Sequence, residues 1–400
     1  MKAAETNEKK INKIYDTVVV GAGPYGLSIA AHLQEKGQNI AVFGKPLYLW
    51  KNHMPKGMLL RSIWWASFLS DPQRKFDLVQ YGKKNNIKIP HPLPMDMFLD
   101  YSLWFQKNVL PNVDETYINN IVKKDGNFVF TLADGREIQS KAVVMACGLA
   151  YYVHIPDEFT KLPKEFVSHT YDYGDFEHLK GKDIVIVGGG QSALETGAIM
   201  HENGINIEIV MRKQLNWLKP DNRERGMIEC LRTPDAGMGA GWINRALEVS
   251  PYFFQKLPRK VKDWHLNGRG KHGPAGSFWL KSRLEKVTIN ENEPIKDVKV
   301  EGKKVVITLK SGKVVKADHV ILATGYKADL DKLYMIDESL RRQIKVYKGM
   351  PVLNGHFEST IKDMYFVGYS SHMSFGPLYR FIVGAPATAK RVAKAITKNN

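Results

Sequence analysis

The chain has only two cysteines in 400 residues, Cys147 and Cys230. They lie far apart, so the sequence has no CxxC redox pair, no four-cysteine metal site and no disulfide framework. Thiol–disulfide reductase chemistry is therefore disfavoured, and a reducing compartment, the cytoplasm, is the expected location. We interpret Cys147, at the end of a predicted strand, as a small buried side chain and not as a nucleophile.

Long apolar runs and acidic residues are also scarce. No stretch of about 18 apolar residues occurs, so the sequence predicts no transmembrane segment. The 58 Lys and Arg residues outnumber 41 Asp and Glu residues, which gives a net charge of +17. We interpret this excess as a lysine-rich solvated surface; the alternative is attraction of anionic ligands or membranes, and no module signature supports nucleic acid. The first ten residues lack an apolar core and are expected to fray.

Glycine-rich turns, in contrast, occur twice in the same context. The two segments are 17–26, TVVVGAGPYG, and 183–193, DIVIVGGGQSA. Each has a β-branched run, a glycine turn and a helical pattern, as dinucleotide-binding units do. At one constant offset, FVFTLADG at 128–135 is followed by VVITLKSG at 305–312, and ACG at 146–148 by ATG at 323–325. The repetition predicts two nucleotide sites and suggests electron transfer between two dinucleotides.

We therefore predict an α/β fold with two Rossmann-like domains, each with a β-meander, the second domain being inserted into the first. The first domain is predicted to comprise 12–155 and 325–400, and the second 160–324. Two long insertions interrupt them, a lid segment at about 45–115 and an insertion at about 214–284 that contains a basic cluster, 256–271.

The expected elements follow the periodicity of the apolar residues. In the first domain they are strand–turn–helix–strand over 16–43, a helix at 96–109, a meander at 116–140, a separate strand at 142–146, a strand at 364–368 and a last helix at 377–397. In the second they are strands at 183–187 and 206–211 around a helix at 191–203, a meander at 298–316 and a strand at 319–323.

Each glycine turn has the same expected roles. The first glycine permits the tight turn, the second lets a pyrophosphate approach the backbone, and the third position lets helix and strand pack closely. The helix N-terminus then faces the anion. The predicted contacts are Gly21, Gly23, Pro24, Tyr25 and Gly26 in the first unit and Gly188, Gly190, Gln191, Ser192 and Ala193 in the second.

The residues after the second strand of each unit differ. An acidic residue normally stands there and binds an adenosine ribose. The first unit has FGK at 43–45, so the ribose contact is expected from the backbone or from Lys45. The second has MRK at 211–213, and Arg212 with Lys213 suits a 2′-phosphate, which favours NADPH over NADH. The alternative for this pair is an ordinary exposed basic surface.

With these motifs the chain resembles the two-dinucleotide flavoproteins, and within them the class B flavin monooxygenases. That group includes the flavin-containing monooxygenases, the Baeyer–Villiger enzymes and the N-hydroxylating enzymes of siderophore synthesis. Besides the first glycine turn, the resemblance rests on HTYDY at 169–173 with LKGK at 179–182, on LATGY at 322–326, and on GGQSALE at 189–195, which is most similar to the N-hydroxylating branch.

The resemblance implies an NADPH-dependent FAD monooxygenase, with FAD on the first unit and NADPH on the second. Hydride would pass from nicotinamide to flavin N5, and reduced flavin would form a C4a-hydroperoxide with O2. One oxygen atom would then pass to a nitrogen, sulfur or carbonyl centre of a small molecule. No metal is implied.

The lid segment is also similar to the N-hydroxylating branch, with Trp50, His53, Met58 and Asp71-Pro72 at matching spacing. That branch has a lysine seven positions before its Asp-Pro pair, where this chain has Trp64. The change disfavours hydroxylation of a lysine or ornithine side chain. The glycine expected before His169 is also missing, since 164–166 reads KEF.

The candidate catalytic residues are Arg61, Trp64 and His53. Arg61 could bind flavin or an anionic substrate, but an ion pair with Asp71 is the favoured interpretation. Trp64 and Trp65 could form an aromatic pocket, although core packing is more frequent. His53 and His169 could transfer protons, but each is more often structural.

Gly376-Pro377 could begin a helix whose N-terminus stabilises reduced flavin, or an ordinary capped helix. The remaining predicted cofactor residues are Lys45, Trp50, Met58, Gly368, Gly376, Pro377 and Leu378 for FAD and Arg212, Lys213, Thr324 and Gly325 for NADPH.

Two other functions remain open. One is an NADPH-dependent flavoprotein reductase without oxygen transfer. The other is a non-catalytic nucleotide-binding redox sensor whose basic cluster, 256–271, docks an acidic partner or a membrane. The insertions that would shape a substrate pocket contain no readable code, so neither the substrate nor the oligomeric state is predicted.

Overall fold

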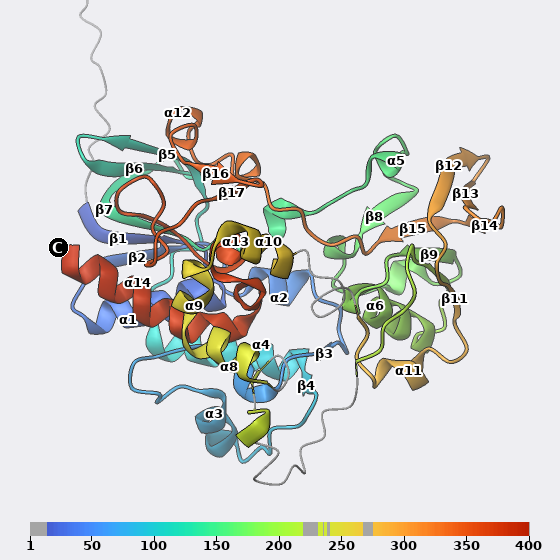
Figure 1. Ribbon diagram of the computed structural model, residues 1–400, viewed down its shortest axis with the longest axis horizontal. Helices are drawn as coiled ribbons and strands as arrows, with labels where there is room; N and C mark the ends of the chain where they lie inside the picture. The colour runs from blue at the N-terminus through green and yellow to red at the C-terminus, as the bar shows by residue number, and fades with distance from the viewer. Residues whose placement is uncertain (1–13, 219–230, 235, 238–240, 267–274, 400) are drawn as a thin grey trace, which may run out of the picture.

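The computed structural model describes residues 14–218, 231–234, 236–237, 241–266 and 275–399. The first ten residues, Cys230 and part of the basic cluster, 267–271, lie outside the described residues. Two α/β units lie side by side along the longest axis of the molecule (Figure 1). The segments that join them run antiparallel, with Val153 paired to Tyr326.

The first unit is built on a six-stranded sheet in the order β2-β1-β7-β6-β5, with β18 also paired to β7. Helix α1 contacts α14, the last helix, so the two ends of the described chain meet in this unit. This confirms that the second unit is inserted into the first. The bounds are β1 Ile14–Val20, α1 Pro24–Glu35, β2 Ile40–Phe43, β5 Ile118–Lys124, β6 Asn127–Leu132, β7 Glu137–Met145, β18 Met364–Phe366 and α14 Ala385–Asn399.

Strand β7 corrects one prediction, because the third meander strand and the expected separate strand at 142–146 are one continuous strand. Its first half pairs antiparallel with β6, and its second half pairs parallel with β18, while β1 pairs along the other edge. Burial alternates in the first half and is continuous over 142–145. The meander is therefore part of the nucleotide-binding sheet.

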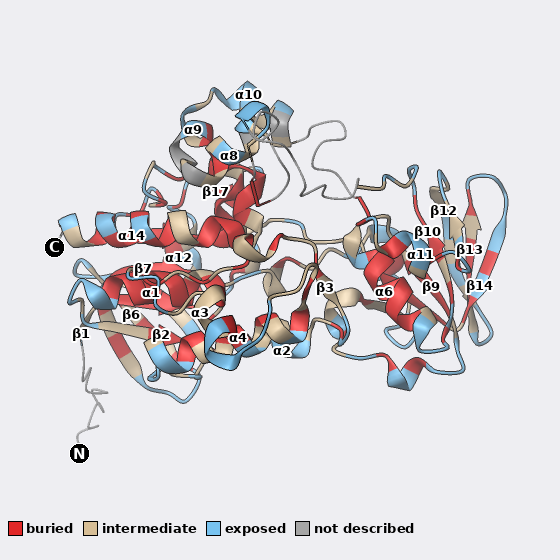
Figure 2. Cartoon of the chain, turned by 90° about the horizontal axis from the view of Figure 1, so that it is seen from below, coloured by how far each residue is buried: buried red, intermediate tan, exposed pale blue. Residues whose placement is uncertain are grey.

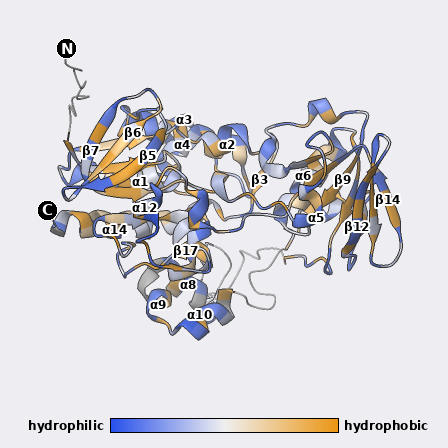
Figure 3. Ribbon diagram, turned by 90° about the horizontal axis from the view of Figure 1, so that it is seen from above, coloured by the Kyte–Doolittle hydropathy of each residue, from blue (hydrophilic) through white to orange (hydrophobic). Residues whose placement is uncertain are grey.

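The second unit has a five-stranded parallel sheet in the order β11-β10-β9-β15-β8. Ile184 and Ile186 pack with α6 on one face, and Val185 packs with β13 and β14 on the other (Figures 2 and 3). Here the meander stays a separate three-stranded sheet. The bounds are α5 Asp157–Thr160, β8 Val167–His169, β9 Asp183–Val187, α6 Gln191–Glu202, β10 Asn206–Val210, α11 Leu280–Arg283, β11 Thr288–Asn290, β12 Ile295–Glu301, β13 Lys304–Leu309, β14 Val314–Ala317 and β15 His319–Leu322.

Both long insertions cross between the units. The lid segment packs on the first unit and reaches α6, and Met58 contacts the hydrophobic cores of both. The helices of the insertion cover the first unit, where Leu247 and Phe254 belong to its core (Figure 1). In the lid segment the bounds are α2 Tyr48–Asn52, β3 Leu59–Leu60, α3 Leu78–Asn85, β4 Leu93–Pro94 and α4 Met95–Val109. In the second insertion they are α8 Trp242–Val249, α9 Pro251–Lys256 and α10 Arg259–Leu266. The first unit also contains α12 Glu338–Arg341, β16 Val346–Tyr347, β17 Met350–Pro351 and α13 His372–Phe375.

Part of the basic cluster packs on the first unit instead of facing solvent alone. The Arg259 guanidinium lies 3.8 Å from the centre of the Tyr347 ring, and Tyr347 donates a hydrogen bond to Asp263. Asp263 also pairs with Lys348 at 3.1 Å. These contacts join α10 to the β16–β17 hairpin of the first unit.

The last helix begins later than predicted. Residues Pro377–Arg380 and Ile382–Gly384 form two short 3-10 turns, and α14 begins at Ala385. The Tyr25 hydroxyl lies 3.0 Å from the carbonyl oxygen of Tyr379 and 2.7 Å from that of Phe381. Phe381, between the two turns, has extended backbone with φ −118° and ψ 164°, so Pro377 does not begin a long helix with a strong dipole.

Candidate dinucleotide sites

The first glycine turn joins β1 to α1 and has the expected geometry. Gly21 has φ +111°, and a Cβ there would overlap the carbonyl oxygen of Ala146. A Cβ on Gly26 would overlap the carbonyl oxygen of Gly21, because helix and strand pack closely at this point. Both positions therefore require glycine for steric reasons.

Gly23 has a different reason to be glycine. It is the N-cap of α1, it makes no side-chain cap hydrogen bond, and a Cβ there would meet no atom within 4 Å. Pro24 follows at the first helical position. The uncapped N-terminus of α1 thus faces open space, where its N–H groups and helix dipole favour an anion such as a pyrophosphate.

The second glycine turn is built in the same way. The Gly188 amide donates to Val210 at 2.9 Å, as Gly21 donates to Phe43 at 2.8 Å. Gly188 has φ +149°, and a Cβ there would be 2.5 Å from the Ala323 carbonyl oxygen. Gly190 caps α6 without a side-chain hydrogen bond. Ala193, fully buried, takes the third position.

The cations after β10 are placed as the NADPH prediction requires. Arg212 and Lys213 follow the carboxyl end of β10, and both side chains are exposed. Neither forms an ion pair with a residue that the structure describes. The 2′-phosphate contact stays a prediction.

In the first unit, a carboxylate that the sequence did not predict lies beside the carboxyl end of β2. Asp114 pairs through its backbone with Val42 and Gly44, at 2.9 and 2.8 Å. Its carboxylate is bound by Arg136 at 2.8 Å, and Lys45 lies 5.5 Å from the Tyr48 ring centre. Residue 114 is about 70 positions beyond the end of β2, so no local signal could have found it.

The C-terminal segment, residues 364–399, packs against the first glycine turn. The ring of Tyr25 lies against Gly368, where a Cβ would be 3.4 Å from it, and its hydroxyl is held by the 379–381 backbone. Gly376 has φ +100°, and a Cβ there would lie 3.1 Å from the Phe254 ring. Tyr25 therefore connects the turn to the backbone at Tyr379 and Phe381. Pro377 and Leu378, which precede Tyr379, are both buried.

Arg61 does not form the predicted ion pair with Asp71. The Asp71 carboxylate accepts the backbone N–H groups of Lys75 and Phe76, at 2.9 and 3.1 Å. Burial lowers the pKa of Arg61, and repulsion from Arg380 lowers it further. The predicted ion pair between Arg61 and Asp71 is thus wrong, and the alternative, that Arg61 binds a ligand, stays a prediction.

The aromatic candidates of the lid segment pack on their neighbours. Trp64 lies edge-on to Trp65, with ring centres 5.5 Å apart, and is half-buried. Trp50 packs on Phe98 at 4.6 Å. These contacts are those of core packing.

The two candidate histidines lie at the contact between lid segment and second unit. His53 donates to the Tyr171 carbonyl at 2.6 Å and stacks on its ring at 4.1 Å. His169 accepts the Tyr171 N–H at 3.0 Å, and burial lowers the pKa of His169 to about 4. His169 is thus a neutral, buried imidazole bound to the backbone, as a structural histidine is.

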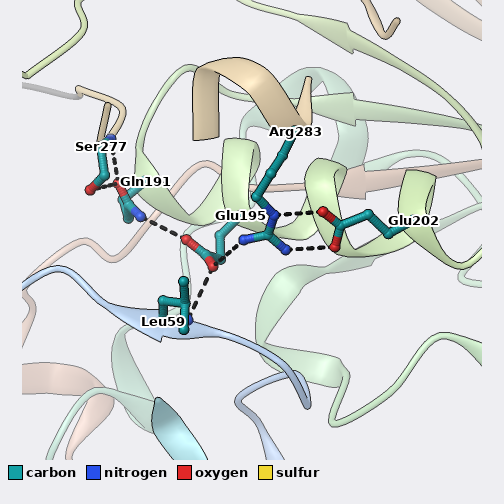
Figure 4. A network of polar contacts seen from close by, with 6 residues as sticks. All are labelled: Leu59, Gln191, Glu195, Glu202, Ser277 and Arg283. Carbon is teal, nitrogen blue, oxygen red and sulfur yellow. Dashed lines mark hydrogen bonds and ion pairs between the residues drawn. The ribbon is translucent and has the colours of Figure 1, made fainter. Parts of the chain in front are cut away.

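Gln191 and Thr324, predicted to contact the second nucleotide, already form hydrogen bonds within the protein. The Gln191 side chain donates to Glu195 and accepts from Ser277, which leaves its backbone N–H and the second N–H of its NH2 group for the predicted pyrophosphate contact (Figure 4). Thr324 donates to the carbonyl of His154 at 2.5 Å, and Gly325 has φ +77°. Both lie in the segments that join the units.

Burial raises the pKa of the Cys147 thiol to about 12, which favours the predicted packing role over that of a nucleophile. In the part of the chain that the structure describes, no group of His, Cys, Asp and Glu side chains is placed to hold a metal ion. Among the same residues, no helix has the length and hydropathy needed to cross a bilayer.

Two glycine turns of one design, each at the carboxyl end of a parallel strand, define an oxidoreductase with two dinucleotide-binding units. The chain belongs to the pyridine nucleotide-disulphide oxidoreductase family, whose model matches residues 18–232. A second model, flavin containing amine oxidoreductase, matches residues 272–359. The predicted fold class and enzyme class are confirmed.

Several relatives belong to the predicted group of monooxygenases, and others are thioredoxin and ferredoxin–NADP reductases. A probable indole-3-pyruvate monooxygenase of Arabidopsis thaliana is 24% identical, over 78% of this chain and 73% of its own. An L-ornithine N(5)-oxygenase of Arthrobotrys oligospora is 26% identical, over 80% of this chain and 73% of its own. The ornithine hydroxylase structure from Pseudomonas aeruginosa has a TM-score of 0.77, with 18% identity, over 96% of this chain and 99% of that one. At that identity the likeness concerns the fold.

Proposed function

We propose that the protein is an NADPH-dependent FAD monooxygenase that transfers one oxygen atom from O2 to a small molecule. The observation that carries this proposal is the pair of matching glycine turns, with Gly21 and Gly188 packed alike on Ala146 and Ala323. The uncapped N-termini of α1 and α6 fit the pyrophosphates of FAD and NADPH. When bound, FAD supplies the chemistry of hydride acceptance and oxygen transfer.

The residues of this chain would bind, orient and shield the cofactors. The first turn and the C-terminal segment would hold FAD, and the second turn with Arg212 would hold NADPH. The lid segment would exclude water. A nitrogen centre is the favoured acceptor, because the ornithine relative is an N-oxygenase by name. A cytoplasmic location belongs to the same proposal.

The test combines cofactor binding with oxygen consumption. Purified protein should bind FAD, and stopped-flow absorbance after mixing reduced protein with O2 and NADP+ should show a transient distinct from oxidised and reduced flavin. NADPH oxidation should then depend on an amine, thioether or ketone substrate. Dye reduction without the transient, even with substrates present, would favour the reductase. A protein that binds no FAD would favour the nucleotide-binding sensor.

A further inference from the structure

A buried carboxylate lies where the lid segment meets the second unit. Glu195 of α6 is 1% exposed and accepts three hydrogen bonds (Figure 4). The donors are Leu59 N at 3.1 Å, Gln191 Nε2 at 2.8 Å and Arg283 Nη1 at 3.3 Å. All three partners donate, so only an acceptor with two oxygens satisfies them together.

The three donors come from three separate parts of the chain. Leu59 is in β3 of the lid segment, Gln191 is the first residue of α6, and Arg283 is in α11, after the insertion. The Gln191 carbonyl oxygen accepts Ser277 N and Oγ, at 3.0 and 2.9 Å. Glu195 therefore joins the lid segment and the end of the insertion to the helix of the second glycine turn.

The contact with the lid segment is made by the backbone of β3. Leu59 pairs with Pro94 of β4, and proline has no N–H to donate to the Leu59 carbonyl. The Leu59 N–H donates to Glu195 Oε1 at 3.1 Å. Burial raises the pKa of Glu195, and the bonds from Leu59, Arg283 and Gln191 act against that shift. Loss of the carboxylate would leave a partly buried N–H unpaired.

We propose that Glu195 is a positioning residue that couples nucleotide binding at the second glycine turn to the placement of the lid segment at Met58–Arg61. A pyrophosphate on the N–H groups of Gln191 and Ser192 would order the first turn of α6. Gln191 then holds Glu195, and Glu195 holds Leu59. Met58, the neighbour of Leu59, already contacts the cores of both units. The inference rests on the proposed function for the identity of the nucleotide.

The direct test is hydrogen exchange of the Leu59 amide, followed by NMR or mass spectrometry, in E195Q and E195A. In E195Q the NH2 group faces the NH2 group of Gln191 and breaks that bond, while the remaining oxygen still accepts Leu59 N and Arg283. E195A removes both oxygens, so it should speed exchange of the 58–61 amides about tenfold in cofactor-free protein, whereas E195Q should change it little. NADP+ should slow this exchange by about fivefold or more in the unaltered protein and leave it unchanged in both variants.

Glu202 provides the matched control. It holds the same Arg283 at 2.6 and 2.7 Å but makes no contact with Leu59. E202Q should leave the exchange of residues 58–61 and its response to NADP+ unchanged. Flavin reduction at saturating NADPH should fall about tenfold in E195Q and not in E202Q, while the Kd for NADP+ changes less than about threefold.

An NADP+-dependent slowing of exchange at residues 58–61 in E195Q as large as in the unaltered protein would overturn the proposal, as would equal effects of E195Q and E202Q. Should E195A fail to fold, the response of E195Q to NADP+ still decides. If the protein bound neither FAD nor NADP+, the proposed function would fail on its own, and coupling would be refuted with it. Faster exchange in cofactor-free E195A would then show only the structural contact.

Discussion

At the residue scale, the two units differ in the charged side chains that lie at the carboxyl end of their second strand. The first has a carboxylate, Asp114, neutralised by Arg136, whereas the second has Arg212 and Lys213 without an acidic partner in the described chain. An unpaired guanidinium at the carboxyl end of a strand suits a phosphate dianion, because it offers a planar pair of donors.

Arg212→Ala is therefore expected to raise the KM for NADPH by about 10- to 100-fold, since one charge-assisted phosphate contact is lost. The KM for NADH, which lacks the 2′-phosphate, should stay almost unchanged. Steady-state kinetics with both nucleotides makes the comparison. Equal increases for the two nucleotides would contradict the assignment of Arg212 to the 2′-phosphate.

Buried histidines predict a second residue-scale effect, on stability. Burial lowers the pKa of His32 from 6.5 to about 4, and its Nε2 lies 3.0 Å from Ser70 Oγ. Between these values the unfolded chain binds a proton that the folded chain does not. The contribution is complete above pH 6.5 and is lost as the pH falls towards 4.

Replacing His32 with Gln should therefore flatten the loss of stability between pH 6.5 and 4 by up to about 3 kcal/mol. Urea unfolding of both proteins at a series of pH values measures the difference, in which the other titrating groups cancel. Parallel curves for the two proteins would show that His32 binds protons equally in the folded and unfolded states, so that burial does not shift its pKa.

At the element scale, the last helix begins later than the sequence pattern predicts. Apolar periodicity continues through 377–397, yet the Tyr25 hydroxyl binds the backbone at Tyr379 and Phe381 and α14 begins only at Ala385. Burial raises the pKa of Tyr25 well above its ordinary value, so the hydroxyl stays a donor.

Tyr25→Phe should cost about 1–3 kcal/mol of unfolding free energy, because two backbone carbonyls lose a buried donor. Protease sensitivity should rise at 377–384. Tyr48→Phe serves as control, since Tyr48 is 38% exposed. Denaturant unfolding compares the three proteins, and equal stability of all three would remove Tyr25 as the link between the glycine turn and the C-terminal segment.

At the scale of the whole molecule, each of the two long insertions packs on both units. The lid segment reaches Glu195 of the second unit, and helices α8 to α10 cover the first. Phe254 is 1% exposed and lies against Gly376 of the C-terminal segment. The insertion therefore supports the region predicted to hold the flavin.

Phe254→Ala should destabilise the protein by about 3–5 kcal/mol, as truncation of a buried phenylalanine does. Limited proteolysis should then cut within 242–266. The neighbouring Phe253 is 53% exposed, so Phe253→Ala should change the stability by less than about 0.5 kcal/mol. Similar losses in both variants would mean that these helices do not dock through Phe254.

The sequence by itself determined the repeated strand–turn–helix units, because the backbone conformation that a residue favours and the pattern of apolar and polar residues are local properties of the chain. Gly21 and Gly188 stand where a side chain would strike the neighbouring strand, and β9 spans the predicted residues 183–187. Tertiary structure alone decided the continuity of β7, the start of α14 and the partners of Asp71, Asp114 and Glu195. Those features depend on groups far apart in the chain, and no local pattern records which of them meet after folding.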